Sequence, residues 1–570
     1  MELRVIPSSA SWQTIGAATP SLIVDPDQTP KSENIFIPAT ASSNQNAFVK
    51  PLNPLLLTTT LAATGCVSTG SEVGDTMIIG LGGVIWALPS LLAGAHILAT
   101  QNGRQSPFGW LAASFFIPVL GPALWFAIGA EPHLPTSSNP KHTFLNNRFA
   151  ERRPDSTLPD EIPDFVPESF RPMLRLSRTI TREPLVGGNR ITPLFDGEET
   201  YPSMLEAIES EPKSGFIYVG MYIFENNEMG EKFAAALKRA QDRGVEVRVI
   251  VDRLGSFVAM PHDIKKIWQL FCERGQLPTS MELLDRHGVR YERFAPGASL
   301  RNGLPWNIIY HKKFLVTSRK AYLGSINIGD TYMVTRTDIK GRHQDIQYLI
   351  EGPAAPLIEA VHREDWAYIT GAPAEKSRSN GARAGEDYIR VIRSMPNDDF
   401  ESFKKIVLSA IGLTAPGEKV RLQTAYFAPD REFIRALELA CQRGVVVQLI
   451  LSKENTVPPV DWASRQFFSD LLDAGVELYY QPPPFDHTKL VTIGDYYTIG
   501  SSANFDHRSQ TFHNEASIEI YSKRVNAIVA ARFDRITANS QNRVTREWVK
   551  SWPWYERLRN AISQLPSYVY

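Results

Sequence analysis

A duplicated strand–helix–strand segment constrains the fold of this chain more than any other feature. Residues 215–252, "GFIYVGMYIFENNEMGEKFAAALKRAQDRGVEVRVIVD", can be aligned with residues 419–452, "KVRLQTAYFAPDREFIRALELACQRGVVVQLILS". In each copy an apolar strand leads through an acidic turn into an amphipathic helix, and a β-branched strand follows. Alternating strands and helices of this kind predict a helix-covered sheet, built twice.

The predicted helices of the two copies share their detailed pattern. Their apolar residues recur at three- and four-residue intervals, at Phe233, Ala236, Leu237 and Ala240 and again at Phe433, Ala436, Leu437 and Ala440. Each helix is followed by an Arg-Gly pair, whose glycine is Gly244 or Gly444. We expect these glycines to take the left-handed conformation that commonly ends a helix.

Each copy continues into a stretch that carries a histidine, a lysine two residues later and, further on, an asparagine. These are His311, Lys313 and Asn327 in "WNIIYHKKFLVTSRKAYLGSINIGDTY" and His487, Lys489 and Asn504 in "FDHTKLVTIGDYYTIGSSANFDHRS". Side chains two apart on a strand point to the same face, so each histidine and its lysine project together.

This set of side chains suits a phosphate. Lysine ammonium groups neutralise phosphate oxygens, asparagine amides donate hydrogen bonds to them, and an imidazole attacks phosphorus or transfers a proton. Displacing an alkoxide from phosphorus requires a nucleophile and, on the opposite side, an acid that protonates the leaving oxygen. Two copies that meet across a pseudo-twofold axis supply both groups, which gives the duplication a chemical reason.

The motifs resemble those of the phospholipase D superfamily, in which His-x-Lys-x4-Asp is followed by Gly-Ser and Asn, twice per active site. The closer likeness is to bacterial cardiolipin synthases of the phospholipase D type, and it runs from about residue 77 to 550 through phrases such as "GSINIGDTY" and "SANFDHRS". The resemblance implies an α/β fold of two tandem phospholipase D-like α/β/α sandwich repeats with pseudo-twofold symmetry. We expect the repeats at residues 166–372 and 373–570.

The resemblance also implies a reaction. One histidine forms a covalent bond with the phosphatidyl group of phosphatidylglycerol, and the other protonates the departing glycerol and then activates a second phosphatidylglycerol, so that cardiolipin is the product. By analogy we assign His311 as nucleophile and His487 as acid and base, with Asp345 and Glu515 as the carboxylates that orient the histidines. No metal or other cofactor is implied. A hydrolase, a transferase to another alcohol and a catalytically silent membrane scaffold are the alternatives.

The sequence departs from the family pattern directly after the four residues that follow each lysine. The family has aspartate there, whereas this chain has Ser318 (or Thr317, if the turn is realigned) and Gly494, with Asp495 one position late. The departure places local structural support in doubt and motivates the scaffold alternative. We expect activity to persist, because the phosphoryl chemistry depends on the histidines, lysines and asparagines.

Two runs without charged residues, 77–99 and 107–130, precede the repeats. Each is long enough to cross a bilayer as a helix, so a transmembrane helical hairpin is predicted at 77–130, after a flexible extension at 1–76 and before a Pro-rich linker at 131–165. A pair of buried core helices is the alternative. Basic residues after the second run favour a cytoplasmic catalytic part on the bacterial inner membrane, whereas a lipoprotein cleavage site ending at Cys66 would reverse that orientation.

Composition limits the other functions. A formal charge of −1 provides no global basic field for nucleic acid, so phospholipids and the bilayer are the expected partners. Three scattered cysteines support neither a disulfide framework nor a zinc site. Five other histidines are predicted to be surface or structural residues, namely His287, His343, His362, His507 and His513. The terminal stretch "WVKSWPWYERLRNAISQLPSYVY" is compatible with packing or with a lipid interface.

Overall fold

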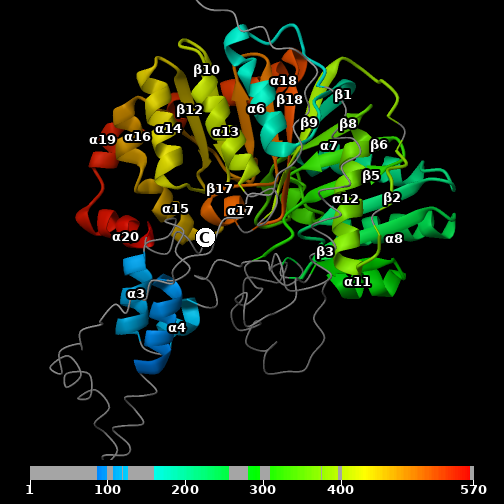
Figure 1. Cartoon of the computed structure of the whole chain (residues 1–570), viewed down its shortest axis with the longest axis horizontal. Coiled ribbons are helices and arrows are strands. Elements are labelled where there is room, and N and C mark those ends of the chain that lie inside the picture. Colours follow the sequence, from blue (N-terminus) through cyan, green and yellow to red (C-terminus); the bar gives the residue numbers. More distant parts are fainter. Residues whose placement is uncertain are drawn as a thin grey trace, which may run out of the picture. The chain divides into compact units, whose positions relative to one another are not determined.

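The structure is a computed structural model. It describes residues 87–98, 107–117, 120–125, 160–253, 255, 280–294, 308–373, 375–379, 381–395, 401–511 and 513–564. The predicted extension at 1–76 and nearly all of the predicted linker lie outside these residues. From residue 160 onward the described chain is built around one 14-stranded sheet (Figure 1).

Each half of the chain contributes seven strands to this sheet. The first half provides β1 (Val186–Phe195), β2 (Phe216–Met221), β3 (Glu246–Asp252), β4 (Tyr291–Phe294), β5 (Lys313–Thr317), β6 (Lys320–Gly324) and β8 (Ile346–Glu351). The second half provides β9 (Asp387–Ser394), β10 (Lys419–Thr424), β12 (Val446–Ser452), β13 (Glu477–Gln481), β15 (Leu490–Ile493), β16 (Tyr497–Ser501) and β18 (Glu515–Tyr521).

The strand order is β13-β12-β10-β15-β16-β18-β9-β1-β8-β6-β5-β2-β3-β4. Read from the centre outward, each half has the same order, so the two halves are related as a pseudo-twofold axis requires. Two short parallel pairs complete the strands: β11 (Phe427–Ala428) with β17 (Phe505–Asp506), and β7 (His343–Gln344) with β14 (Phe485–Asp486).

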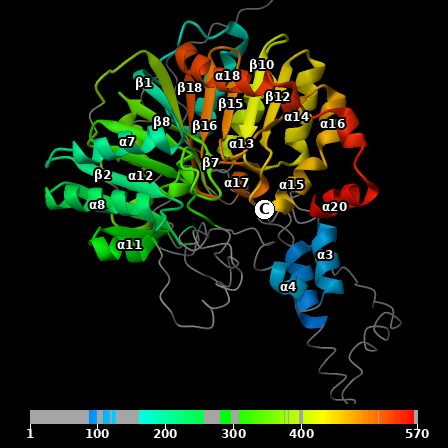
Figure 2. The ribbon, with the colours of Figure 1, turned by 180° about the vertical axis from the view of Figure 1, so that it is seen from behind.

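Helices cover both faces of the sheet (Figures 1 and 2). In the first half they are α7 (Asp196–Glu209), α8 (Glu228–Asp242), α11 (Ser280–His287) and α12 (Ala355–Thr370). In the second half they are α13 (Ser402–Leu413), α14 (Arg431–Gln442), α15 (Pro458–Arg465), α16 (Phe468–Ala474), α17 (His507–Thr511), α18 (Lys523–Thr537), α19 (Arg546–Lys550) and α20 (Trp554–Gln564). Short 3-10 turns occur at Glu168–Phe170, Asp330–Tyr332 and Ser540–Asn542.

The alternation of side chains along β2 explains why both faces are covered. Ile217 and Val219 join a buried core with α7, α8 and α11, whereas Phe216 and Tyr218 join a second core with α12. Successive residues of a strand point to opposite faces, so the fully buried β2 needs helices on both. The second core also contains residues of α18 and β9, and it therefore joins the two halves into one body.

The duplicated helices begin and end as the sequence predicts. The side chain of Asn227 accepts a hydrogen bond from the Gly230 amide at the start of α8, and Asp430 caps α14 in the same way. Gly244 and Gly444 take φ values of 89° and 86°, which confirms the predicted left-handed termination.

The segment before β1 packs with the second half of the chain. Helix α6 (Pro172–Thr181) buries Met173 and Leu174 in a core formed by α13, α14 and the strands of the second half. The boundary predicted at residue 166 assigns this helix to the first repeat, whereas its apolar side chains serve the second. The sequence could not predict which half α6 packs against, because either half offers an apolar surface to an amphipathic helix.

The predicted hairpin lies partly outside the described residues. Residues 87–98 form a helix, and α3 (Pro107–Phe116) and α4 (Leu120–Leu124) follow. Among these helices the Trp125 Nε1–H donates to the His96 Nδ1 at 3.1 Å, and Ala93 and Ile97 are buried. None of the helices in the described part of the chain combines the length and the apolar character that a bilayer span requires.

Candidate active site

The structure gathers the motif residues of both halves at one edge of the sheet. Lys313 is the first residue of β5 and Lys489 immediately precedes β15, and their histidines lie two residues earlier. Asn327 and Asn504 follow β6 and β16, which pair with those strands. All six side chains are buried; even His311 and His487 are only 6% and 8% exposed.

Each histidine is held by a carboxylate from the opposite half. The Nδ1 of His311 lies 2.7 Å from the Oε1 of Glu515, and the Nδ1 of His487 lies 2.8 Å from the Oδ2 of Asp345. The sequence predicted both carboxylates as orienting groups but did not predict that the pairs cross between halves. Neither half can therefore build a complete histidine–carboxylate pair alone.

Backbone pairing between the halves produces this crossing. In the β7–β14 pair, Asp486 lies opposite Gln344, and the next amide, of His487, donates to the Gln344 carbonyl at 2.8 Å. The amide of His311 donates in the same way to the carbonyl of Asn514 at 2.9 Å. Each histidine thus sits beside the residue that precedes its carboxylate partner, and the side chains meet as a result.

The serines that lie two residues before each motif asparagine hold the other carboxylate oxygens. The Ser325 hydroxyl donates to the Oδ1 of Asp345, and the Ser502 hydroxyl donates to the Oε2 of Glu515. Each serine comes from the same half as the carboxylate that it holds. Two serine–carboxylate–histidine chains of hydrogen bonds therefore cross the junction between the halves. Each chain fixes the orientation and the tautomer of its imidazole.

Burial lowers the pKa of both motif lysines, to about 7 for Lys313 and about 8 for Lys489. Their ammonium groups also donate to backbone, Lys313 to the His311 carbonyl at 2.6 Å and Lys489 to the His487 carbonyl at 2.5 Å. An ammonium group that has lost most of its water gains strongly from an anionic ligand, because a phosphate oxygen replaces the missing solvation.

Burial and the charges of both lysines lower the pKa of His311 and of His487 well below the usual histidine value. The two lysines act on both imidazoles, so all four groups share one electrostatic environment. Each Nδ1–H donates to its carboxylate, which leaves the Nε2 lone pair of a neutral ring available for attack or for proton transfer. Burial also raises the pKa of Asp345 to about 6.

The two motif asparagines are held differently. The Asn327 Nδ2 donates to the Tyr332 hydroxyl at 2.7 Å, and its Oδ1 accepts from the Ile223 amide at 3.0 Å. The Asn504 Nδ2 has only a 3.5 Å contact with the Ser509 hydroxyl, and its buried Oδ1 lacks a hydrogen-bond partner among the described residues. The amide of Asn504 is thus less constrained than that of Asn327.

A second pair of histidines lies beside the first, at positions that the sequence pattern did not predict. The ring of His513 lies 5.5 Å from that of His311, and the ring of His343 lies 6.0 Å from that of His487, measured between centroids. The signal was present: each precedes an orienting carboxylate by two residues, in His343-Gln-Asp345 and His513-Asn-Glu515. These two histidines were predicted to be surface or structural residues, and the structure places them beside His311 and His487.

One cluster of the site has the composition of a metal site. Ligand atoms of His311, His513 and Glu515 all lie within 4.8 Å of one another. Two imidazoles and a carboxylate would suit a zinc-like ion. In the described arrangement the Nδ1 of His311 and the Oε1 of Glu515 are engaged with each other, so such an ion would have to displace their hydrogen bond.

The positions of the absent motif aspartates lie at the far ends of the strands, away from the motif histidines. Thr317 ends β5, and its hydroxyl accepts from the amides of Arg319 and Lys320 at 3.3 and 3.2 Å. Gly494 follows β15 with a φ of 55°, a left-handed conformation that suits glycine. Both substitutes therefore support turns, and neither position contributes to the cluster of histidines and lysines.

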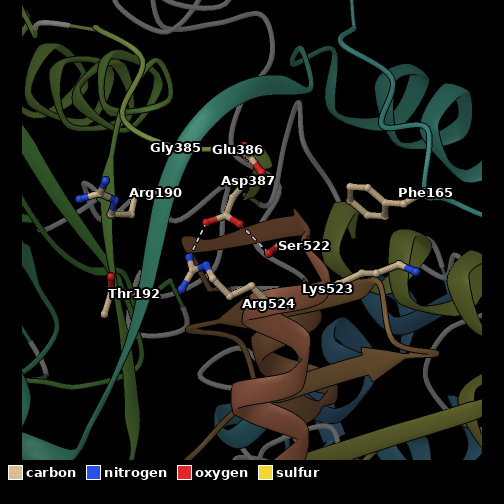
Figure 3. Close-up of a pocket in the computed structure, with 9 residues that line it drawn as sticks. All are labelled: Phe165, Arg190, Thr192, Gly385, Glu386, Asp387, Ser522, Lys523 and Arg524. Atoms are coloured by element: carbon tan, nitrogen blue, oxygen red, sulfur yellow. Dashed lines mark hydrogen bonds and ion pairs between the residues drawn. The ribbon is translucent and has the colours of Figure 1, made fainter.

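Two cavities lie apart from the motif side chains. One, of about 550 Å³, lies where β1 meets β9, and Figure 3 shows Asp387 bonded there to Arg524 and Ser522. The other, of about 560 Å³, is lined by Gln344 and Arg532 among others. The motif histidines, lysines and asparagines line neither cavity.

Comparison with known proteins places these motifs in a family. The family model described as "Cardiolipin synthase, PLD-like domain" matches residues 207–347 and 410–537, one segment in each half. A cardiolipin synthase of Geobacillus kaustophilus is 26% identical over 451 residues, which cover 78% of this chain and 85% of that protein. A cardiolipin synthase of Geobacillus thermodenitrificans is 28% identical over 434 residues, which cover 75% of this chain and 82% of that protein.

Among solved structures, a phosphatidylserine synthase of Haemophilus influenzae aligns with a TM-score of 0.52. The alignment covers 70% of this chain and all of that one at 13% identity, so it supports the fold alone. The sequence relatives, the twofold family match and the duplicated motif geometry agree with one another. These findings support a phosphatidyltransferase of the phospholipase D superfamily that is similar to the cardiolipin synthases.

Proposed function

We propose that this protein is a membrane-bound enzyme that makes cardiolipin from two molecules of phosphatidylglycerol and releases glycerol. The observation that carries the proposal is the pair of crossed histidine–carboxylate hydrogen bonds in one buried cluster with two lysines. Such a cluster offers a nucleophile, an acid and base, and two cations to a single phosphodiester. The cardiolipin synthases found by comparison supply the substrate class.

In the first step the Nε2 of His311 attacks the phosphorus of phosphatidylglycerol. The bond between phosphorus and the glycerol oxygen breaks, and protonated His487 gives its proton to that oxygen, so that glycerol leaves and a phosphatidyl-histidine remains. The anionic phosphodiester, once bound between the lysines, counteracts their effect and favours the protonated form of His487. Lys313, Lys489 and the two asparagines stabilise the charge that develops on the phosphate oxygens.

In the second step the now neutral His487 removes the proton from a hydroxyl group of a second phosphatidylglycerol. The resulting oxygen attacks phosphorus, and the bond to the Nε2 of His311 breaks. Cardiolipin is released, and the site returns to its starting protonation state. The two steps balance without a cofactor. His487 gives one proton to the departing glycerol and regains one from the hydroxyl group of the second phosphatidylglycerol.

Location is part of the proposal. We place the enzyme at the bacterial cytoplasmic membrane, with the predicted hairpin at 77–130 as anchor and the catalytic part in the cytoplasm. The support is the uncharged sequence of the two runs and the basic residues that follow them. An anchored site meets lipid acceptors at a high effective concentration, which favours transfer to lipid over transfer to water.

Lipid analysis of a bacterium without cardiolipin tests the proposal. Expression of the wild-type chain should restore cardiolipin and consume phosphatidylglycerol, whereas His311→Ala should restore none at equal protein abundance. Phosphatidic acid with free glycerol as the main products would identify a hydrolase instead. Undiminished cardiolipin from His311→Ala would contradict the assigned nucleophile, and a wild-type chain without any lipid product would favour the scaffold alternative.

A further inference from the structure

Helix α20 presents its apolar side chains outward and its polar side chains inward. Trp554, Tyr555, Leu558 and Ile562 are 74%, 59%, 51% and 53% exposed. At about 3.6 residues per turn these four positions fall within about 100° of the helix circumference, so they form one continuous face. An apolar face of this kind normally covers a core.

The inward face of α20 carries the polar residues. Asn560 and Ser563 are buried, and the guanidinium of Arg559 lies over the ring of Trp462 in α15, at 4.7 Å from its centroid. The orientation is therefore fixed by contacts with α15 and is opposite to that expected for a helix of a water-soluble surface. The outward face is the part of this helix that lacks a covering partner among the described residues.

The charge around this face is basic. Arg546, Lys550 and Arg557 are exposed on α19 and α20, and the Arg557 guanidinium donates to the carbonyls of Trp552 and Lys550. Basic residues outnumber the acidic Glu547 and Glu556 of the same helices, although Arg546 is paired with Asp473 at 3.2 Å. Aromatic side chains at one end of an apolar face, flanked by arginine and lysine, are typical of a helix that lies in the interface of an anionic bilayer.

Helix α20 also lies on the catalytic side of the second half. It packs against α15, which contacts β11, and β11 pairs with β17, whose first residue Phe505 follows Asn504 directly. Figures 1 and 2 both show α15, α17 and α20 along the same border of the second half. A surface resting on α20 would therefore meet the chain near the edge at which its motif residues gather.

We propose that the outward face of α20, Trp554, Tyr555, Leu558 and Ile562, lies in the interface of an anionic phospholipid bilayer and brings the catalytic edge to the lipid headgroups. The inference deepens the proposed function, because it concerns how a lipid substrate reaches that site. It is independent of the predicted hairpin: an anchor holds the chain near the membrane, whereas α20 sets the side of the catalytic part that faces it.

A fluorescence experiment tests the contact without any need for activity. The full chain, with its three native cysteines replaced by serine, carries one bimane label at Leu558→Cys or, as control, at Leu439→Cys, an outward position on α14 that is 47% exposed. Both are reconstituted in vesicles of phosphatidylglycerol and phosphatidylethanolamine with or without brominated acyl chains. Brominated lipid should reduce the fluorescence at 558 by about twofold or more, because an interfacial helix buries its apolar face about 5–10 Å deep. The label at 439 should not change.

Three results would overturn the proposal. One is a label at 558 that brominated lipid leaves unquenched, and another is a label at 558 quenched no more than the control. The third is self-quenching between 558 labels that disappears on dilution with unlabelled chain, since it would show a second copy covering the face. Because no turnover is measured, failure here would leave the proposed reaction untouched, and failure of the lipid analysis would leave this contact standing.

A kinetic measurement gives a second readout. The triple variant Trp554→Ser, Leu558→Ser and Ile562→Ser should raise the KM for surface concentration of phosphatidylglycerol in mixed micelles by at least about tenfold, since each large apolar side chain contributes strongly to partitioning. Its kcat at saturating lipid should stay near the wild-type value. Leu439→Ser with Ile528→Ser, on outward positions of α14 and α18, is the matched control and should change neither constant. An unchanged KM in the triple variant contradicts the proposal.

Discussion

The first and second halves of the sheet hold the same motif side chains in different surroundings. His311 is flanked by the ring of Tyr222 at 4.8 Å and by His513, whereas His487 is flanked by His343 and by Tyr332 at 6.1 Å. Tyr222 belongs to the same half as its histidine, but Tyr332 reaches across from the first half to the second. The duplicated backbone is symmetric, and the environment of the two imidazoles is not.

The asparagines show the same contrast. Asn327 has both ends of its amide bonded, while Asn504 keeps an oxygen without a partner in the described part of the chain. Two identical histidines cannot divide the roles of nucleophile and acid unless their surroundings differ. The residues that surround each motif must therefore decide which histidine acts as nucleophile and which as acid. Experiments that change equivalent residues in the two halves can identify them.

Removal of each histidine should have the largest effect. His311→Asn and His487→Asn should each lower cardiolipin formation by about 10³-fold or more, as expected when a nucleophile or its acid partner is lost. A phosphatidyl-p-nitrophenol substrate separates the two, since its leaving group needs no acid. His487→Asn should then release a burst of nitrophenol and hold a phosphohistidine, and His311→Asn should do neither. A burst from His311→Asn alone would mean that the roles are reversed.

The crossed carboxylates should have the next largest effect, and they test the exchange between halves directly. Glu515→Gln and Asp345→Asn should each lower turnover by about 10²-fold. Without its carboxylate, each histidine is no longer held in the required tautomer and orientation. With the nitrophenyl substrate, Glu515→Gln should weaken the burst, since Glu515 holds His311. Asp345→Asn should leave the burst and slow the later step. If instead Asp345→Asn removed the burst, each carboxylate would serve the histidine of its own half.

Much of this arrangement could be predicted from the sequence, because it depends on local pattern. The period of apolar residues fixed the duplicated helices, and Gly244 and Gly444 marked their ends. The two-residue spacing placed each histidine beside its lysine. These features depend on residues near one another in the chain, where the geometry of helices and strands leaves little freedom.

The crossing of the carboxylates could not be predicted in the same way. Asp345 and Glu515 are in equivalent positions, and nothing local distinguishes a bond to the histidine of one half from a bond to the other. The outcome depends on the pairing of β7 with β14, which joins segments more than a hundred residues apart in the chain. The packing of α6 with the second half is a long-range choice of the same kind.

The two lysines should give a smaller difference, visible as a function of pH. Each lysine attracts an anion only while protonated, so affinity is greatest below both pKa values and is lost as pH rises through about 7 for Lys313 and about 8 for Lys489. Tungstate, a phosphate analogue, should bind the wild-type protein with both inflections in a calorimetric titration series. Lys313→Met should bind about tenfold more weakly at pH 6, the loss expected for one charge-assisted hydrogen bond, and should retain only the upper inflection.

Lys489→Met is the matched counterpart and should retain only the lower inflection. Because the readout is binding, a variant without activity remains informative. A single inflection common to wild type and both variants would show that neither lysine titrates in this range. If Lys313→Met kept the lower inflection and Lys489→Met kept the upper one, the order of the two lysine pKa values would be the reverse of that given above.

The turns that replace the family's aspartates should give the smallest effect, on stability instead of activity. Gly494→Ala should destabilise the fold by about 1–2 kcal/mol, because a non-glycine residue pays this much in the left-handed region; its φ is 55°, and an added Cβ would lie 2.5 Å from Tyr496. Thr317→Val in the first half should cost about 1 kcal/mol through lost hydrogen bonds. Gly412→Ala, a helical position with open space around it, is the control and should not destabilise. Denaturant midpoints in detergent measure all three.

Both turns lie at the strand ends away from the histidines, so activity per folded molecule should be unchanged in the two turn variants. A large loss of activity at 25 °C in either variant would mean that the missing aspartates do matter to the edge that carries the motif histidines.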